Sequence, residues 1–324
     1  MSKVQISVII PLLNEEESLP ELSSWIKSVM EENKFSFEVV FIDDGSTDNS
    51  WSIIEGLNAK DDRFKGIQFN RNFGKSAALD TGFKACKGEV VITMDADLQD
   101  SPDEIPQLYA MIAEEGFDMV SGWKKKRHDP IGKTLPSKFF NRITRMISGI
   151  KLHDFNCGLK AYKRSVVKNI SVYGEMHRYI PLIAKWSGYS NIGEKVVEHR
   201  ARKYGTTKFG WERFIHGFLD LLSISFVSRF KQNPMHFFGL LGTVSFVAGL
   251  GFTVKILWDK LDSIYFSKIP LTRDVTDQPI FFLALAALVI GVQLFLAGFL
   301  AEMIAMNRTG KNDYIISDKL GLKE

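Results

Sequence analysis

The chain has 324 residues, of which 45% are hydrophobic, so it is long enough for two domains and apolar enough for a substantial core. Its 41 basic and 38 acidic residues give a net charge of +3, which by itself excludes few classes of partner. We expect no nucleic-acid partner. Cys86 and Cys157 are too few and too far apart for a disulfide framework or a zinc site, as expected in a reducing compartment. The N-terminus leads directly into a predicted strand, so we expect no cleavable signal peptide.

Three short apolar segments near the N-terminus have the character of buried strands, and each ends in a polar loop. They begin at residues 4, 38 and 65 and lead into the motifs PLLNEEES, DDGSTDNS and NRNFGKS. Helical patterns at residues 18–30 and 50–57 separate these segments. Strands that alternate with helices predict an α/β domain with a mostly parallel sheet flanked by helices, whose polar loops share one edge.

A fourth apolar segment, within GEVVITMDADLQDSPD, leads directly into Asp95 and Asp97. Because side chains alternate along a strand, both carboxylates can point the same way at the carboxyl end of the sheet, where open α/β sheets bind ligands. Two such carboxylates repel each other unless a cation lies between them, and Mg²⁺ or Mn²⁺ takes carboxylate and phosphate oxygens. The pair indicates a metal and diphosphate site; the alternative is an acidic turn that caps the helix beginning near Pro102.

Two other nucleotide-binding motifs fail at particular positions. A dinucleotide fold requires G-x-G-x-x-G after the first strand, where this chain has Pro11-Leu12-Leu13-Asn14-Glu15. Gly74-Lys75-Ser76 is similar to the end of a phosphate-binding P-loop, but the first glycine of that motif is replaced by Phe69. Neither motif explains the polar edge of the predicted sheet.

Two long apolar segments occupy the C-terminal third of the chain. Residues 237–258 are apolar apart from Lys255, and residues 280–301 carry no charge. Each has about 22 residues, which is enough to cross a hydrocarbon core of roughly 30 Å. We expect two transmembrane helices; the alternative is a buried helical hairpin in a soluble protein, in which uncharged segments of this length are rare.

Charges beside these segments predict the topology. Arg229 and Lys231 precede the first segment, Arg308 and Lys311 follow the second, and acidic residues outnumber basic ones at 259–279 between them. The positive-inside rule then places both termini in the cytoplasm and the connecting loop outside.

Two amphipathic segments precede the apolar ones. Residues 211–232 carry apolar side chains at helical spacing, and a second segment begins near Pro136 with a basic stripe of Lys138, Arg142 and Arg145. Basic amphipathic helices with aromatic residues favour anionic membrane surfaces, so we expect both at the interface. The alternative is that these helices pack against their own sheet.

Together, PLLNEEESLP, VVFIDDGSTDNS, NRNFGK and MDADLQDSPDEIP resemble the metal-dependent family 2 glycosyltransferases with the GT-A fold, in that family's order and near its separations. The resemblance implies a nucleotide-sugar donor bound with Mg²⁺ or Mn²⁺. It assigns Asp43 to the base and Asp44 to the ribose, for which the alternative is a plain Asx turn. The other donor-binding residues that it implies are Pro11, Asn14, Glu15, Asn72, Lys75 and Asp95, and the metal ligands are Asp95, Asp97 and Gln99.

A GT-A domain joined to a small membrane domain is similar to the polyprenyl-phosphate glycosyltransferases, which include the dolichol-phosphate-mannose synthases and the bactoprenol glucosyltransferases. The resemblance covers essentially the whole chain, which lacks the Q-x-x-R-W motif of processive polysaccharide synthases. It implies an acceptor phosphate site in WKKKRHDPIGKTLPSKFF and RKYGTTKF, whereas the lysines at 124–126 are expected to form a solvated loop. The acceptor residues that it implies are Arg127, Lys133, Ser137 and Arg202.

The resemblance also implies a mechanism, direct displacement at the anomeric carbon with inversion. A phosphate acceptor is largely dianionic at neutral pH, so it needs no strong base. Asp97 would act with the metal on the leaving diphosphate. Asp154, in HDFNCGLKAYKR, matches a position often proposed as the family's base. We expect it to position the reacting groups or to stabilise an oxocarbenium ion; a structural carboxylate is the alternative.

We expect glucose from UDP-glucose as the transferred sugar and undecaprenyl phosphate as the acceptor, while GDP-mannose, UDP-N-acetylglucosamine and UDP-aminoarabinose fit the same motifs. A non-catalytic membrane scaffold would bind a nucleotide sugar without forming a glycolipid. We expect the protein to lie in the bacterial inner membrane, with its catalytic domain in the cytoplasm. The resemblance also implies a homo-oligomer, a tetramer. The expected parts are a catalytic domain at 1–210, an amphipathic helix at 211–234, two transmembrane helices at 235–310 and a tail at 311–324.

Overall fold

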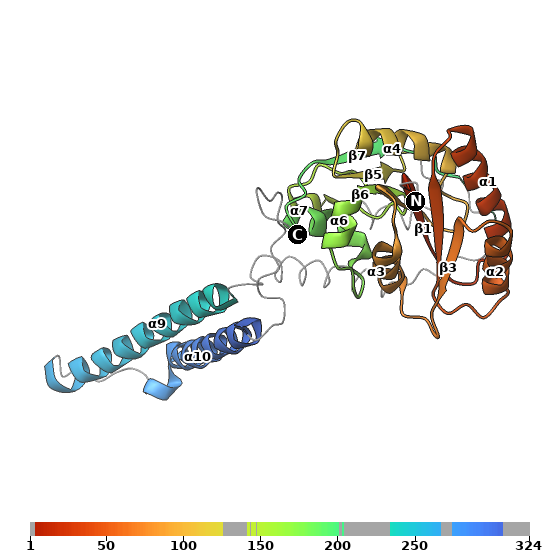
Figure 1. Ribbon diagram of the computed structural model, residues 1–324. Helices are drawn as coiled ribbons and strands as arrows, with labels where there is room; N and C mark the ends of the chain where they lie inside the picture. The colour runs from red at the N-terminus through yellow and green to blue at the C-terminus, as the bar shows by residue number, and fades with distance from the viewer. Residues whose placement is uncertain are drawn as a thin grey trace, which may run out of the picture. The chain divides into compact units, whose positions relative to one another are not determined.

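The computed structural model describes residues 4–125, 141–142, 144–146, 148–200, 203, 234–266 and 274–306. The chain divides into two compact units, Met1–Leu222 and Ser223–Glu324 (Figure 1). Within the described residues, the first unit is a sheet covered by helices and the second is a pair of long helices. The strand-rich part and the apolar part of the sequence are thus separate structural units.

The first unit contains, within its described residues, a seven-stranded sheet with the order β3-β2-β1-β4-β6-β5-β7. Strand β6 runs antiparallel to both of its neighbours, and all other pairs are parallel. The predicted mostly parallel sheet is therefore confirmed. The strands are β1 (Ile6–Leu12), β2 (Phe37–Asp43), β3 (Phe64–Gln68), β4 (Val90–Thr93), β5 (Met119–Trp123), β6 (Lys160–Lys163) and β7 (Ile192–Val196).

Helices cover both faces of this sheet (Figure 1). Because successive side chains of a strand point to opposite faces, Val8 and Ile10 enter one core and Ile9 enters the other. Strands buried on both sides must be apolar throughout, which explains the apolar segments of the sequence. The first core is closed by α1 (Leu19–Glu32), α2 (Ser50–Lys60) and α4 (Ile105–Ala113), and the second by α3 (Lys75–Ala85), α6 (Arg164–Asn169) and α7 (Ile180–Trp186).

Strands β1, β2 and β3 end in register along one edge, and β4 ends three residues short of them. Leu12 of β1 lies opposite Asp43 of β2, and Asp43 lies opposite Gln68 of β3. On the other side of β1, Ile9 lies opposite Thr93 of β4. The loops that follow these four strands therefore emerge side by side, as the sequence predicts.

The second predicted amphipathic segment is partly described. Residues 141–142, 144–146 and 148 are helical, and Asn141, Thr144 and Ser148 are buried. The apolar residues of this segment do not share one environment, because Ile150 is buried whereas Met146 is 79% exposed. The helix packs a polar face on its own domain and leaves Met146 outside. The first amphipathic segment, at 211–232, lies outside the described residues.

The second unit has two helices that are long and apolar enough to cross a membrane, α9 (Pro234–Leu261) and α10 (Pro279–Met306). Each helix has 28 residues. At 1.5 Å per residue that is about 42 Å, more than a hydrocarbon core of roughly 30 Å. Leu240, Phe282 and Ile304 are among many large apolar side chains on the surface. Such a surface favours a membrane location over a buried hairpin in a soluble protein.

Small residues allow α9 and α10 to pack closely. A side chain on Gly242 would meet the Gly291 carbonyl oxygen at 2.7 Å, and Ser245 Oγ donates a hydrogen bond of 2.9 Å to the Ala287 carbonyl. One boundary differs from the prediction: after α9 the chain continues as a π-helical turn to Phe266, inside the segment predicted as a loop. The apolar side chains of Ile264, Tyr265 and Phe266 continue the helical pattern there.

Candidate active site

The strand-end loops bring Lys75 and Asp95 into direct contact. Lys75 begins α3, and its Nζ donates a hydrogen bond of 2.5 Å to Asp95 Oδ1. Burial opposes the charge of Lys75, but the Asp95 carboxylate outweighs burial and raises the pKa of Lys75. Burial likewise opposes the charge of Asp95, but Lys75 lowers the pKa of Asp95 to about 2. The two groups therefore form a charged pair at neutral pH.

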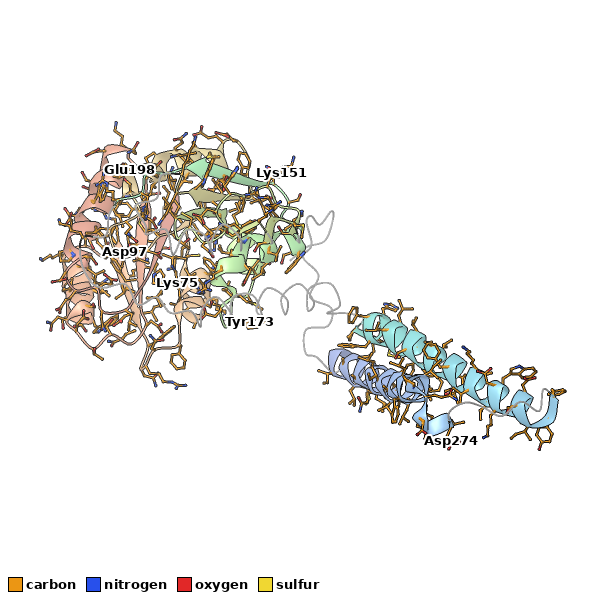
Figure 2. The ribbon with its side chains drawn as sticks, turned by 180° about the vertical axis from the view of Figure 1, so that it is seen from behind. Lys75, Asp97, Lys151, Tyr173, Glu198 and Asp274 are labelled. Atoms are coloured by element: carbon orange, nitrogen blue, oxygen red, sulfur yellow. The ribbon has the colours of Figure 1, made fainter. Side chains whose placement is uncertain are left out.

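Asp97, labelled in Figure 2, belongs to the same loop as Asp95. Its electrostatic environment is different. Burial, followed by the charges of Asp95 and Asp100, raises the pKa of Asp97 to about 6. Its Oδ1 accepts a hydrogen bond of 3.2 Å from the Gln99 backbone N–H, and the residue between them, Leu98, has a left-handed φ of 59°. The neighbours of Asp97 therefore favour its protonated form, and a bound cation would stabilise the ionised form instead.

The residues of this loop fit a divalent cation that is shared with a ligand. Within the described ranges, no group of three or more His, Cys, Asp or Glu residues could hold a metal. Asp95 and Asp97 would supply one or two carboxylates, so the remaining ligands would come from a diphosphate, water or Gln99. Mg²⁺ is commonly bound in this way, by few protein groups together with substrate phosphates.

The pKa of Asp97 predicts how metal binding depends on pH. Asp97 must be ionised to bind a cation, so the affinity for Mn²⁺ should be constant above pH 7 and fall as the pH drops through about 6. Below that value we expect the Kd for Mn²⁺, measured calorimetrically with an intact UDP-sugar present, to rise about tenfold per pH unit. Asp103→Asn changes an exposed carboxylate and should keep this profile. An affinity that stays constant from pH 7 to pH 5 would contradict the assignment.

Gly158 gives the Asp95 carboxylate its space. A Cβ at this position would lie 2.6 Å from Asp95 Oδ2, so a glycine is required where the loop before β6 passes the site. Thr93 Oγ1 donates a hydrogen bond of 3.0 Å to the Gly158 carbonyl. This contact fixes the loop to the end of β4, directly beside Asp95.

Asp43 and Asp44 are buried and hold the loops together. Asp43 Oδ1 accepts a hydrogen bond of 2.8 Å from the Ser46 backbone N–H, which is the turn that we considered as the alternative. Asp44 accepts hydrogen bonds from the backbone N–H groups of Phe73 and Gly74, at 2.7 and 2.9 Å. Asp44 therefore positions the loop that carries Lys75. Contacts of these carboxylates with a base or ribose stay predictions.

Asn14 and Glu15 connect the first loop to the second. Asn14 has a left-handed φ of 56°; its N–H donates to Ser46 Oγ at 2.9 Å, and its Oδ1 accepts from the Thr47 N–H at 2.8 Å. The Glu15 N–H donates to Ser50 Oγ at 3.0 Å. These bonds hold the first loop against the second.

A small cavity lies next to Asp95. Its volume is about 20 Å³, which is room for roughly one water-sized group. Three of the predicted donor residues, Pro11, Lys75 and Asp95, line it. Asn72 is exposed on the loop before Lys75. Three basic residues that were not predicted from the sequence also line the cavity. They are Lys160, His177 and Arg178.

Burial opposes the positive charge of two of these residues, Lys160 and His177. Lys160 is 4% exposed and donates a hydrogen bond to the Cys157 carbonyl. Burial lowers the pKa of Lys160, and the charge of Lys75 lowers it further. Burial, followed by the charges of Lys75 and Arg178, lowers the pKa of His177 to about 2, so this imidazole is neutral. The one signal in the sequence was a pair of adjacent basic residues, His177 and Arg178.

Asp154 is 1% exposed in the loop before β6. Glu194 of β7 holds this loop, because its Oε1 accepts hydrogen bonds from the backbone N–H groups of His153 and Asp154 at 2.6 and 3.1 Å. The His153 ring stacks on Trp123, with the ring centroids 4.0 Å apart. Sequence reasoning missed Glu194, which anchors the predicted catalytic loop from the far edge of the sheet.

The prediction of a solvated lysine loop is wrong for Lys124. Its side chain is 13% exposed, and its Nζ lies 2.9 Å from Asp100 Oδ1. Burial opposes the charge of Lys124, but the fully buried Asp100 raises the pKa of Lys124 because it requires a counter-charge. Lys125 is exposed, as expected. The predicted acceptor residues Arg127, Lys133, Ser137 and Arg202 lie outside the described residues.

Comparison with known proteins agrees with this geometry. The model of the family "Glycosyl transferase family 2" matches residues 7–171, which include all four strand-end loops. The chain belongs to glycosyltransferase family 2. The glycosyltransferase is 36% identical over 313 residues to dodecaprenyl-phosphate galacturonate synthase of Rhizobium johnstonii, with 94% of this chain and 89% of that protein covered. It is 34% identical over 301 residues to undecaprenyl-phosphate 4-deoxy-4-formamido-L-arabinose transferase of Aeromonas hydrophila, with 92% and 88% covered.

Solved structures confirm the fold of the glycosyltransferase. Glucosyl-3-phosphoglycerate synthase from Mycobacterium tuberculosis in complex with UDP superposes with a TM-score of 0.52 at 20% identity, covering 68% of this chain and 80% of that one. The same enzyme in complex with Mn²⁺ and UDP-glucose also gives 0.52, at 19% identity and with 70% and 79% covered. At this level of identity the likeness establishes the GT-A-like fold alone.

Proposed function

We propose that this glycosyltransferase transfers a sugar from a nucleotide sugar, a UDP-sugar, to the phosphate of a membrane polyprenyl phosphate. The observation that carries the proposal is the pair Asp95 and Asp97 at the strand edge, in a chain that also has two helices of membrane-spanning length. The names of both relatives specify a polyprenyl-phosphate product or acceptor over nearly the same length of chain. Undecaprenyl phosphate is the acceptor that we infer for a bacterial membrane.

The site residues suggest how transfer proceeds. Asp95 and Asp97, with Gln99, would hold Mg²⁺ or Mn²⁺, which when bound neutralises charge on the departing diphosphate. Lys75, already charged beside Asp95, can pair with a diphosphate oxygen on the same side. Asp154 is buried in a loop that Glu194 anchors, so a positioning role suits it better than that of a solvent-exposed base.

The acceptor phosphate would bind the basic residues that the resemblance implies. An arginine offers two parallel donors to phosphate oxygens, a lysine a point charge and a serine a neutral donor. Attack by the phosphate oxygen on the face opposite the leaving group would invert the anomeric configuration. The residues concerned are Arg127, Lys133, Ser137 and Arg202.

The sugar that we expected, glucose, receives no support from the relatives. Their names specify galacturonate and 4-deoxy-4-formamido-L-arabinose. We therefore place uronic acid and aminopentose donors ahead of UDP-glucose. The non-catalytic scaffold is less favoured, because Asp95, Asp97 and Lys75 are all retained at the strand edge.

We place the protein in the bacterial inner membrane, with α9 and α10 as its anchor and the catalytic unit on the cytoplasmic side, where nucleotide sugars are made. The apolar surface of these helices supports the membrane location. The charges beside the spans support the orientation. A homo-oligomer, a tetramer by resemblance, is part of the same proposal.

Direct assay of the lipid product tests this function. The full-length protein would be incubated with undecaprenyl phosphate, Mn²⁺ and a panel of UDP-sugars, and the glycolipid would be identified by its mass. One UDP-sugar should give a product that carries one sugar on the lipid phosphate, with inverted anomeric configuration by NMR. Binding of donors without any glycolipid would instead support the scaffold.

A further inference from the structure

Ser76, the residue after Lys75, makes two contacts with one residue of a distant segment. Its Oγ accepts a hydrogen bond of 3.1 Å from the His177 backbone N–H and lies 3.0 Å from His177 Nδ1. Burial keeps this imidazole neutral, because it lowers the pKa of His177 to about 2. A neutral ring can accept the hydroxyl hydrogen at Nδ1 while the hydroxyl oxygen accepts from the N–H. Ser76 is 1% exposed, so a buried hydroxyl joins α3 to η2 (Met176–Tyr179).

The same distant segment also holds α3 one turn further along. Asp80 Oδ1 accepts a hydrogen bond of 3.0 Å from the Val172 backbone N–H. Ser76 and Asp80 are four residues apart, so they lie on the same face of the helix. Residues 172–177 therefore fix one face of α3. The loop in front of α3 is fixed separately, by the hydrogen bonds that Asp44 accepts from its backbone.

Lys75 lies between these two anchors, as the first residue of α3. The N–H groups in the first turn of a helix have no partners within the helix, so outside contacts must hold this turn. Lysine has a flexible four-carbon chain, and the place of its ammonium depends on where its backbone is held. The contact of 2.5 Å between Lys75 Nζ and Asp95 Oδ1 depends on such a fixed backbone.

We propose that Ser76 and His177 are positioning residues of the donor site, which hold the first turn of α3 so that Lys75 presents its ammonium to the diphosphate of the nucleotide sugar. The inference rests on the proposed function, because it requires a diphosphate beside Asp95. Charge-assisted hydrogen bonds depend on distance and angle, so a shift of the helix start weakens the pairing. Neither positioning residue has to touch the substrate.

A double-mutant cycle between Ser76→Ala and Lys75→Met tests this role. The Kd for UDP would be measured calorimetrically with Mn²⁺ at one fixed pH, on the full-length protein. Lys75→Met should raise the Kd roughly 10- to 100-fold, as expected for a lost hydrogen bond between charged groups. Ser76→Ala should raise it about fivefold in the parent and by less than about twofold in the Lys75→Met chain, because its effect passes through the lysine.

Substitutions of His177 and a distant serine supply the controls. His177→Asn places an amide oxygen near the position of Nδ1 and should keep the Kd within about twofold of the parent, whereas His177→Leu offers no acceptor and should act like Ser76→Ala. Ser23→Ala in α1 also removes a buried helical hydroxyl, which donates a hydrogen bond of 2.7 Å to the Leu19 carbonyl. It should lower the Tm about as much as Ser76→Ala does and leave the Kd unchanged.

The outcomes separate this inference from the proposed function. An unchanged Kd in Ser76→Ala, or an equal rise in the parent and in the Lys75→Met chain, would overturn the positioning role. The same rise in Ser23→Ala would also overturn it, because the effect would then follow stability alone. UDP binding requires no turnover, so the cycle decides the inference whether or not a glycolipid forms. Glycolipid formation by a Ser76→Ala chain with parent Kd and rate would reject the inference and leave the glycosyltransferase function standing.

Discussion

Asp97→Asn should lower kcat for glycolipid formation by about 10³-fold, with Mn²⁺ and both substrates saturating. The amide keeps the shape of the side chain but removes the negative charge that would hold the cation against the departing diphosphate. EDTA should have the same effect on the parent, and added Mn²⁺ or Mg²⁺ should reverse it. Product formation by mass spectrometry over a time course would give the rates.

Asp103→Asn is the matched control for this substitution. Asp103 lies six residues further along the same segment, is exposed and accepts a hydrogen bond from Trp25. Its loss should change kcat by less than about twofold, since surface substitutions rarely have larger effects. Full activity of Asp97→Asn, or of the parent in EDTA, would remove the metal from the mechanism.

The fold could be predicted from the sequence because the apolar segments of the chain coincide with the strands that are buried. Strands such as β1 and β2 are buried on both faces, so the chain reads as short apolar segments that stop abruptly at polar loops. Parallel pairing then places all of these loops on one edge. The pair Asp95 and Asp97 stood out for the same reason, because no core strand would carry two carboxylates.

The missing parts of the site depend on contacts between distant segments. Lys160 and His177 meet Lys75 in one cavity although 85 and 102 residues separate them from it in the sequence. Antiparallel β6 brings this about, since it enters beside β4 and places Lys160 opposite Thr93. Lys124 was misread for a related reason, as its partner Asp100 lies on another loop. Side-chain periodicity contains no information on such pairings.

A chain that ends at Leu222 should fold and bind UDP like the full-length protein, yet lose nearly all transfer to a long-chain polyprenyl phosphate. The described strand-edge residues all lie in the first unit, which has its own two cores. The lost part holds α9 and α10, which we propose keep the active site at the level of the lipid phosphate. We expect kcat/KM for undecaprenyl phosphate in vesicles to fall by at least about 100-fold, as the local concentration of a tethered substrate is lost.

A short, water-soluble isoprenyl phosphate separates anchoring from catalysis. If the helices only hold the enzyme at the membrane, the truncated chain should transfer sugar to this acceptor at a rate within about tenfold of the full-length protein, because no tethering is involved. Near-parent activity of the truncated chain on vesicles would show that α9 and α10 are not needed for reaching the lipid. Loss of UDP binding would show that the first unit depends on the second for its fold, since its strand-edge loops would then be disturbed without any substitution in them.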